Sequence, residues 1–333
     1  MKLVTFVAAD ASNRIGAVVE GGKTIVDFQA VQERTEGRGS PFFADMLAFI
    51  DGGEAALALA ERSIETALQR KLAPALLNAA STKLLAPVPV PRQMRDCLSF
   101  EKHLVQARER RLRKQAAASA DPKAAMEKFM LDGQAGIPQV WYEQPIYYKG
   151  NRFTVIGTDA TVVWPRASKY MDYELEFGLF IGRKGKNIRQ ADARAHIFGY
   201  TIFNDFSARD IQGREMQGML GPAKGKDFDT GNAMGPWLVT ADEIPDPYAL
   251  TMTARINGEE WSRGSSGEMH HKFERILEHI SADETLYPGE FIGSGTVGNG
   301  CGLELGRELK DGDVVELSVD GLGTLRNKVT RQA

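Results

Sequence analysis

Two glutamates separated by a single residue, Glu174 and Glu176 in YELEFGLFIG, are the first side chains whose spacing could support chemistry. The segment is rich in aromatic and aliphatic residues and is typical of a β-strand. Side chains two positions apart leave the same face of a strand, so the two carboxylates would lie side by side. Their repulsion would be relieved by a proton or by Mg²⁺, Mn²⁺ or Ca²⁺, which prefer oxygen ligands. A solvent-facing pair on an edge strand would give the same spacing, so both interpretations stay open.

A second segment, YTIFNDFSARDIQ, joins a strand-like run to a helix-like one. Asp205, Arg209 and Gln212 stand at positions i, i+4 and i+7, which share one face of a helix. A carboxylate, a guanidinium and an amide on one face suit the binding of a cation together with an anionic substrate. A helix cap followed by an i,i+4 ion pair explains the same residues equally well.

Two further segments contain groups that could act on a substrate. The glycines of LGPAKGKDFDTGN would let the backbone approach a ligand closely, and Lys226 could reach a carboxylate or a developing oxyanion. In RDCLSFEKHL, Asp96 precedes His103 by seven residues, and histidine is the usual general base near neutral pH. The alternatives are a surface loop for the first segment and a packed or exposed histidine for the second.

Two other patterns resemble known sites but lack the surroundings that those sites require. GSGTVG, residues 293–298, has the glycine spacing of a dinucleotide-binding loop, but the NGCGLELG that follows is broken by glycines and strand-like. We therefore expect no nicotinamide cofactor there. His270 and His271, close to Glu268, lack the HExxH spacing of a zinc site, so we predict a loop or a helix start.

The elements that would position these groups begin with a short β-rich unit. Residues 1–30 alternate β-branched runs with glycine pairs, which predicts antiparallel strands, and residues 41–73 predict two helices. Three prolines from Pro87 to Pro91 fix the backbone in an extended connector. We therefore predict a small N-terminal domain of strands and helices over residues 1–85.

The remainder, residues 86–333, is predicted to be a catalytic domain in which strands dominate. A helical, strongly basic stretch covers residues 104–130; it is either a solvated helix face or a lid or wall that attracts an anionic substrate. After residue 147 strand-like runs alternate with Gly- and Asp-rich turns, and helical pieces are expected near 191–196 and 270–281. The predicted fold class is α+β and β-dominated, without regular βαβ alternation.

Composition excludes several classes of protein. The chain has 333 residues, of which 43% are hydrophobic and 26% charged, as in an ordinary globular protein. Its 41 basic and 44 acidic residues give a net charge of −3, so we expect no nucleic-acid partner. Cys97 and Cys301 form no CxxC motif and fit a reducing compartment. No apolar run approaches membrane-spanning length, and the N-terminus reads as a strand rather than a signal peptide, so we expect a cytoplasmic protein without a membrane partner.

Taken in order, these motifs resemble the fumarylacetoacetate hydrolase family. The resemblance covers about Asp96 to Glu316 and lies in Asp-x6-His, ELE, NDxSARDIQ, GPxxGKxF and SGTxxGxG ending in LEL. It implies a divalent cation held by Asp96, Glu174, Glu176 and Asp205. It implies a general base at His103, oriented by Glu304, and groups that bind substrate or stabilise charge at Tyr148, Arg209, Gln212, Lys226, Thr230 and Thr296. It also implies a mixed β-roll or β-sandwich C-terminal domain, a small N-terminal β domain and a homodimer.

The chain departs from fumarylacetoacetases proper at two positions near the substrate. Leu98 and Met216 stand where those enzymes carry tyrosines, so two hydroxyl donors are missing. The metal ligands and the His–Glu pair implied by the resemblance are unaffected, but the identity of the substrate is put in doubt. The stretch over residues 104–130 matches no feature of the family.

The predicted activity is metal-dependent hydrolysis of a carbon–carbon bond in a small 2,4-diketo acid, fumarylacetoacetate or an acylpyruvate such as fumarylpyruvate. A 1,3-dicarbonyl can chelate a divalent cation, which then stabilises the departing enolate. His103, oriented by Glu304, would activate water, Lys226 and Gln212 would stabilise the oxyanion, and Arg209 would hold a carboxylate. Alternatives are decarboxylation, hydration or isomerisation of a keto acid on the same scaffold, and a non-catalytic, metal-stabilised binding protein. The His–Glu pair favours hydrolysis, which needs an activated water.

Overall fold

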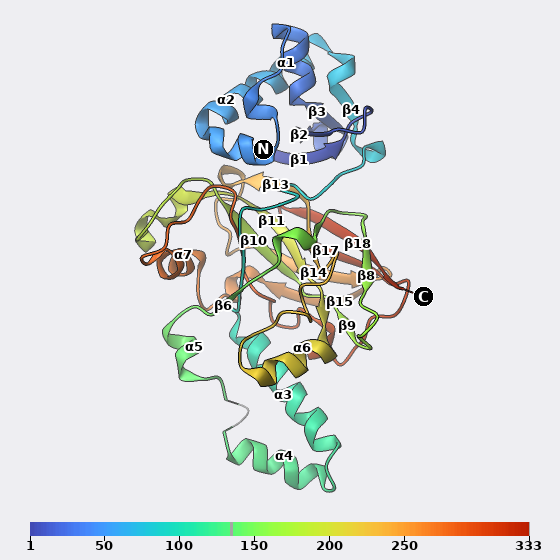
Figure 1. The fold of residues 1–333 in the computed structure, drawn as a ribbon, viewed down its shortest axis with the longest axis vertical. Helices are drawn as coiled ribbons and strands as arrows, with labels where there is room; N and C mark the ends of the chain where they lie inside the picture. The colour runs from blue at the N-terminus through green and yellow to red at the C-terminus, as the bar shows by residue number, and fades with distance from the viewer. Residues whose placement is uncertain (134–135, 333) are drawn as a thin grey trace.

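The computed structural model describes residues 1–133 and 136–332. Figure 1 shows a small N-terminal unit at one end of the molecule and a body rich in strands in the middle. The opposite end is formed by three helices, α3 (Glu101–Ala117), α4 (Pro122–Leu131) and α5 (Gln139–Glu143). The predicted α+β fold is confirmed by this mixture of helices with two large sheets.

The N-terminal unit begins with antiparallel strands, as its β-branched runs predict. The strands are β1 (Lys2–Val7), β2 (Asn13–Val19), β3 (Thr24–Asp27) and β4 (Leu76–Asn78). Between β3 and β4 lie α1 (Phe28–Glu36) and α2 (Met46–Arg70). Gly53, with φ 51° and ψ −134°, breaks α2 into two helical pieces, because glycine tolerates a backbone conformation that other residues avoid.

Strand β1 joins this unit to the body. Leu3 of β1 pairs with Leu238 of β13 (Asn232–Thr240), so the N-terminal strands continue the large sheet of the body. The local sequence of a short strand does not predict such long-range pairing. The domain boundary between residues 85 and 86 therefore stays a prediction.

The large sheet brings strands from distant parts of the chain together. Within the described residues it has eleven strands. Their order is β4, β3, β2, β1, β13, β11 (Ile197–Asp205), β10 (Glu176–Ile181), β16 (Phe291–Gly293), β5 (Met94–Cys97) and β6 (Tyr147–Lys149), with β7 (Val155–Ile156) beside β13. All nine residues of β11 are buried, as expected for a central strand covered on both faces.

A second sheet packs against one face of the first. Its strands are β15 (Glu259–Ser265), β14 (Thr251–Ile256), β17 (Val314–Val319), β18 (Gly323–Arg331) and β8 (Thr161–Trp164). Phe177 and Leu179 of β10 share one apolar core with Leu317 of β17. Phe180, the next residue after Leu179, points to the opposite face of the strand and belongs to a separate core that includes Phe49 of α2. The central strands are thus sandwiched between two cores.

The remaining elements are short. A two-stranded ladder pairs β9 (Met171–Asp172) with β12 (Ser207–Ala208), and the other helices are α6 (Arg209–Glu215), α7 (Phe273–Ser281) and α8 (Gly302–Leu305). Short 3-10 turns cover Glu20–Gly22, Pro41–Phe43, Ala73–Ala75, Ala79–Ser81, Arg152–Thr154, Gln190–His196, Met216–Gly218, Ala241–Glu243 and Ser266–Glu268. No helix in the described part of the chain is long and apolar enough to cross a membrane.

Candidate active site

Three carboxylates from three strands converge on one buried point. Asp96 lies in β5, Glu176 begins β10 and Asp205 ends β11, and one oxygen of each lies within 4.8 Å of the others. Gly293 of the intervening strand β16 pairs with Asp96, and a Cβ at Gly293 would lie 2.4 Å from Asp96 Oδ1. The first glycine of GSGTVG therefore leaves room for this carboxylate cluster, as we name Asp96, Glu176 and Asp205.

Each member of the carboxylate cluster keeps one oxygen without a hydrogen bond. Asp96 Oδ1, Glu176 Oε2 and Asp205 Oδ1 are buried and have no partner among the described residues. Burial and the charge of Asp205 raise the pKa of Asp96 well above its usual range, and burial and the charge of Asp96 do the same to the pKa of Glu176. Burial likewise raises the pKa of Asp205 to about 6, although Lys226 opposes the shift.

Three unpaired, buried carboxylate oxygens fit a hard divalent cation. Buried charges are costly unless they are paired or coordinate a metal, and Mg²⁺, Mn²⁺ and Ca²⁺ take carboxylate oxygens as ligands. The predicted ligands Asp96, Glu176 and Asp205 are thus brought together with free oxygens. Which ion the cluster would hold is not determined by three carboxylates alone.

Glu174, the fourth predicted ligand, faces cationic side chains. Lys226 Nζ lies 2.5 Å from Glu174 Oε2 and 2.5 Å from Asp205 Oδ2, and Arg209 Nη1 lies 2.7 Å from Glu174 Oε1. Burial alone would raise the pKa of Glu174, but the charges of Lys226 and Arg209 outweigh it and lower the pKa to about 2. Coordination by Glu174 stays a prediction, and it would require Lys226 to leave the position between Glu174 and Asp205.

Lys226 therefore neutralises two buried carboxylates at once. Replacing it by methionine keeps the length of the side chain but leaves Glu174 and Asp205 without their shared cation. We expect Lys226→Met to lower the free energy of unfolding by about 3–5 kcal/mol, since removing one partner of a buried ion pair leaves an uncompensated charge. Denaturant unfolding of the chelated protein measures this loss.

The matched control is Lys224→Met, two residues away on the exposed surface. Its effect on the free energy of unfolding should be within about 0.5 kcal/mol, as for most surface substitutions. Equal effects at Lys224 and Lys226 would show that the buried ion pairs contribute nothing specific.

Two predicted substrate contacts orient the carboxylate cluster instead of standing free. The Tyr148 hydroxyl donates to Asp205 Oδ2 at 2.6 Å, and the Thr296 hydroxyl donates to Glu176 Oε1 at 3.1 Å. In each carboxylate the other oxygen is the unpaired one, so these two hydroxyls leave it available for a cation. Thr230, a third predicted contact, accepts a hydrogen bond from the backbone N–H of Val163 in β8 at 2.8 Å. Contact of these hydroxyls with a substrate stays a prediction.

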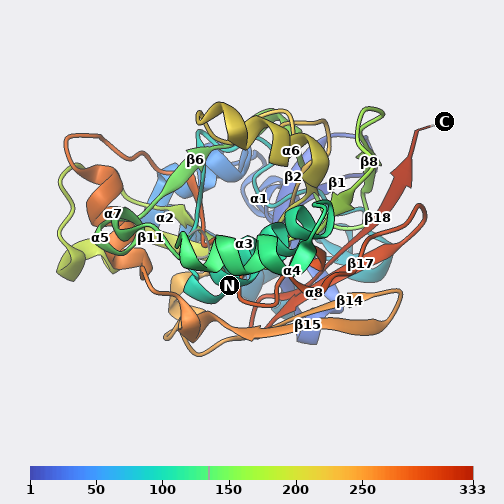
Figure 2. The ribbon, with the colours of Figure 1, turned by 90° about the horizontal axis from the view of Figure 1, so that it is seen from below.

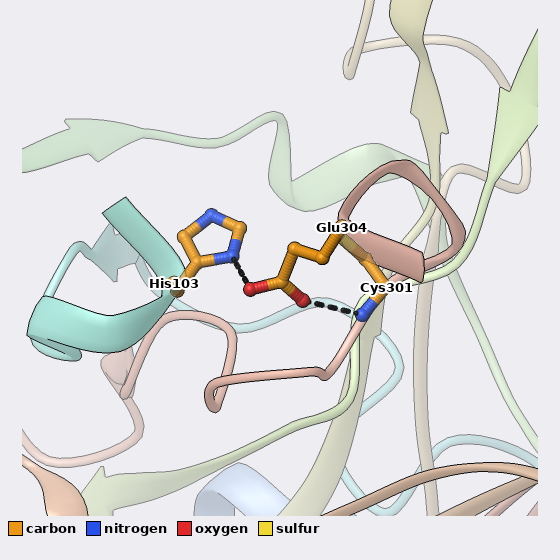
Figure 3. Close-up of side chains that lie close together, drawn as sticks. All are labelled: His103, Cys301 and Glu304. Atoms are coloured by element: carbon orange, nitrogen blue, oxygen red, sulfur yellow. Dashed lines mark hydrogen bonds and ion pairs between the residues drawn. The ribbon is translucent and has the colours of Figure 1, made fainter. Parts of the chain in front are cut away.

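His103 and Glu304 form a hydrogen-bonded pair across 201 residues of sequence. Figure 3 shows the imidazole of His103 facing the carboxylate of Glu304, with Nδ1 at 3.1 Å from Oε1. Glu304 Oε2 accepts the backbone N–H of Cys301 at 2.9 Å, which fixes the carboxylate at the start of α8. With Nδ1–H donating to Glu304, Nε2 of His103 is left as a proton acceptor. The imidazole also lies near Glu174, since its charge is among the causes that lower the pKa of Glu174.

Helix α3 carries His103 near its first turn and is fixed to the loop that contains Thr296. Gln106 Nε2 donates to Asn299 Oδ1 at 2.6 Å, and Gln106 Oε1 accepts the Asn299 backbone N–H at 3.0 Å. Figure 2 shows α3 lying across the body between α6 and the β14–β15 hairpin. The first turns of α3, which carry His103, therefore lie at the site. Further along the same helix the basic residue Arg113 is exposed to solvent.

Arg209 and Gln212 lie on α6 beside these groups. Arg209 Nε donates to Asp172 Oδ2 at 2.9 Å, and Nη1 donates to Gln212 Oε1 at 3.1 Å and pairs with Glu174. Arg209 Nη2 is buried without a partner in the described part of the chain, so one corner of the guanidinium remains for a ligand. Sequence reasoning missed Asp172, although MDYELE places it two residues before Glu174.

The two rejected motifs have structural roles. The loop that follows β16 in GSGTVG is not helical and lines the carboxylate cluster through Thr296, so it has no dinucleotide-binding geometry. His271 Nε2 lies 2.6 Å from the carbonyl of Trp141, and the ring of His270 packs on the ring of Trp141. Around Glu268 and these histidines, the described residues form no group that could hold a metal.

The positions that depart from fumarylacetoacetases proper lie apart in this fold. The Leu98 carbonyl accepts a hydrogen bond from Trp141 Nε1 at 2.6 Å, which ties α5 to the end of β5. Met216 follows α6 and is 41% exposed. Neither side chain supplies a polar group to the site.

Comparison with known proteins agrees with the geometry. Residues 112–330 match the family described as fumarylacetoacetate (FAA) hydrolase C-terminal. The oxaloacetate tautomerase fahd2 of Xenopus laevis mitochondria is 30% identical over 99% of this chain and 90% of its own length. The oxaloacetate tautomerase YisK of Bacillus subtilis is 31% identical over 76% of this chain and 75% of its own.

A solved structure has the same fold. The fumarylacetoacetate hydrolase of Exiguobacterium antarcticum superposes with a TM-score of 0.72 over both whole chains at 24% identity. Asp96 and His103 precede the matched residues 112–330, so the family match does not include them. Their contacts in the structure are the evidence that they belong to the site. By the family match and the full-length relative, this chain belongs to the fumarylacetoacetate hydrolase family.

Proposed function

We propose that this chain is a divalent-metal-dependent enzyme that interconverts the enol and keto forms of a 2-oxo dicarboxylic acid of the oxaloacetate type. The observation that carries the proposal is a buried imidazole that Glu304 holds near Glu174, which Lys226 joins to Asp205 of the carboxylate cluster with its free oxygens. Proton transfer at the carbon beside a carbonyl needs a positioned base and stabilisation of the enolate. Two relatives that match most of this chain are named oxaloacetate tautomerases, which supports the choice of substrate.

The carboxylate cluster would hold the cation, which when bound supplies Lewis-acid stabilisation of negative charge on the substrate oxygens. His103 Nε2 moves the proton to and from the carbon next to the 2-oxo group, while Glu304 holds Nδ1–H and stabilises the imidazolium. Lys226 neutralises Glu174 and Asp205 beside the site and so keeps both carboxylates ionised. Arg209 Nη2, which has no partner among the described residues, donates to a substrate carboxylate. In ketonisation the O–H bond and the C=C π bond of the enol are lost, and a C–H bond and the C=O π bond form. The hydroxyl proton passes to solvent and His103 Nε2 gives a proton to carbon and recovers one from solvent, so atoms and charge balance.

Hydrolysis of a 2,4-diketo acid is the second candidate, because the His103–Glu304 pair is suited to that reaction as well. An imidazole oriented by a carboxylate can activate water as readily as it can move a proton at carbon. The pair therefore does not by itself distinguish hydrolysis from tautomerisation. The reactions share an enolate, which the same cation and Arg209 would stabilise.

An assay that follows the loss of enolic oxaloacetate tests the proposal, with Mg²⁺ or Mn²⁺ and then with a chelator. We expect the metal-loaded protein to accelerate ketonisation above the spontaneous rate and the chelated protein to lose the acceleration. The same preparations are then offered fumarylacetoacetate and a panel of acylpyruvates. Cleavage of an acylpyruvate without ketonisation of oxaloacetate would replace the tautomerase by the hydrolase, and no metal-dependent reaction with any substrate would contradict both.

The partners and the compartment belong to the same proposal. We predict a small-molecule keto acid as the ligand and a homodimer as the assembly, which size-exclusion chromatography with light scattering would test. We also predict a cytoplasmic protein, whereas the Xenopus relative is named mitochondrial.

A further inference from the structure

A single buried carboxylate joins the two halves of the site. Asp172 is fully buried in the short strand β9, and none of the motifs that predict the function includes it. Its Oδ1 accepts the backbone N–H groups of Tyr173 at 3.0 Å and Gly302 at 2.8 Å. Its Oδ2 accepts the backbone N–H of Leu303 and Nε of Arg209, both at 2.9 Å. The four donors fill the acceptor capacity of the carboxylate, so its orientation is fixed.

The fold brings Asp172 to this position through two local features. Ser207 of β12 pairs with Asp172, and the Arg209 backbone N–H donates to the Tyr170 carbonyl at 2.8 Å, which places the first residue of α6 beside β9. On the other side, a Cβ at Gly302 would lie 2.6 Å from Asp172 Oδ1. Glycine at position 302 therefore lets the start of α8 approach the carboxylate closely enough to donate to it.

The two sets of donors belong to different functional groups. Gly302 and Leu303 open α8, the turn that carries Glu304, and Glu304 holds His103. Arg209 shares Oδ2 of Asp172 with Leu303 and carries the buried Nη2 that has no partner among the described residues. A displacement of Asp172 would therefore move both the base and the substrate-binding guanidinium.

We propose that Asp172 is a positioning residue that holds Arg209 and the Glu304-bearing turn in one fixed relation. The inference rests on the proposed function, in which Arg209 binds a substrate carboxylate and His103 moves the proton. Asp172 itself touches neither substrate nor cation. It acts through Arg209 on binding and through the α8 turn on the base.

Asp172→Asn tests this role with almost no change of shape. The remaining oxygen can accept from Gly302, but the new NH₂ group faces the Leu303 N–H and Arg209 Nε, which are both donors. We expect kcat to fall and KM to rise together, with kcat/KM reduced about ten- to a hundredfold, because buried donors lose their acceptor. Binding of oxalate to the Mg²⁺-loaded protein, measured by calorimetry, should weaken in parallel because it reports Arg209 without turnover.

The matched control is Asp210→Asn, at an acidic residue in the first turn of α6. The Asp210 side chain accepts the Ser168 hydroxyl at 2.6 Å and the Lys169 backbone N–H at 2.7 Å, so it fixes the segment before β9 through other partners than the Arg209 guanidinium and α8. We expect this variant to keep kcat and KM within about twofold of the parent, as for a change outside the site. If Asp172→Asn behaves like Asp210→Asn, or loses only thermal stability, Asp172 is merely structural.

A double-mutant cycle keeps the inference testable even if Asp172→Asn does not fold. Arg209→Lys and Glu304→Gln alter the two ends of the connection and leave Asp172 in place. We expect their effects on kcat/KM to be non-additive by at least about fivefold, because both act through one carboxylate. Additive effects would overturn the inference. Every comparison is made against the measured turnover of the parent protein. A parent that is inactive on all the keto acids would contradict the proposed function and not the role of Asp172. Oxalate binding would then still test that role.

Discussion

Replacing His103 by glutamine should abolish most of the turnover while leaving divalent-metal binding intact. His103 is 7% exposed, and its Nδ1 is held by Glu304, so Nε2 is the group available for proton transfer. Glutamine keeps a polar side chain but cannot accept a proton near neutral pH. The expected decrease in kcat is about 10²- to 10⁴-fold, the usual contribution of general acid–base catalysis. Metal-dependent ketonisation of oxaloacetate measures kcat, and calorimetric titration with Mn²⁺ measures the metal affinity.

The control for this substitution is His196→Gln. His196 is partly exposed, and its Nδ1 lies 2.9 Å from the carbonyl oxygen of Arg183, at the end of the Gln190–His196 turn. Its kcat should stay within about twofold of the parent, as for a surface substitution. Near-normal turnover in His103→Gln would show that another group moves the proton, and a loss of Mn²⁺ binding would show that His103 is needed for the metal site.

Replacing Glu176 by glutamine should remove metal-dependent stabilisation without destabilising the metal-free protein. Glu176 Oε2 is buried and unpaired next to Asp96, and burial and this neighbour raise the pKa of Glu176. An amide of the same shape keeps an acceptor for the Thr296 hydroxyl and removes one charge from the carboxylate cluster. A cation at 100 times its Kd should stabilise the parent by about 2.7 kcal/mol and the variant by less than about 1 kcal/mol.

Thermal or denaturant unfolding with Mg²⁺ and with a chelator measures both effects. Glu308→Gln is the control, because Glu308 is exposed and far along the chain from the carboxylate cluster. Its stabilisation by Mg²⁺ should equal that of the parent. A variant at Glu176 that Mg²⁺ still stabilises fully, or whose chelated form is much less stable than the chelated parent, would show that Glu176 is not a ligand but a structural residue.

The sequence predicted that Asp96, Glu176 and Asp205 lie close together, but only because several motifs occur in a fixed order. No local pattern places Asp96 of β5 beside Asp205 of β11, since strands β16 and β10 separate them in the sheet. The His103–Glu304 contact spans 201 residues and follows from the resemblance, not from spacing. Local patterns predicted the N-terminal antiparallel strands and the helical stretch around α3, because hydrophobic periodicity and turn residues are local signals.

What the sequence could not predict concerns how charges are paired. Lys226 was expected to face the substrate, whereas its Nζ lies between Glu174 and Asp205. Tyr148 and Thr296 were expected to contact the substrate, and in the structure they orient Asp205 and Glu176. Such pairings depend on side chains from different strands, and the same residues would satisfy either role on the basis of their chemistry alone.

The pairing of β1 with β13 was missed for a similar reason. Strand β1 lies between β2 and β13, and its four central residues are buried. Its short apolar sequence predicts a strand but does not specify the distant strand with which it pairs. Leu3 opposite Leu238 makes the N-terminal unit part of the main sheet, although the proline connector predicts a separate domain. Separate folding of residues 1–85 thus stays open to test by expression of that segment.

The account depends most directly on one cation bound by three carboxylates beside His103. Anomalous diffraction from a crystal of the Mn²⁺-loaded protein tests it. The account predicts one strong manganese peak with Asp96, Glu176 and Asp205 as ligands at distances normal for metal–oxygen bonds. A peak elsewhere in the molecule, or no peak at a Mn²⁺ concentration that supports full activity, would contradict it.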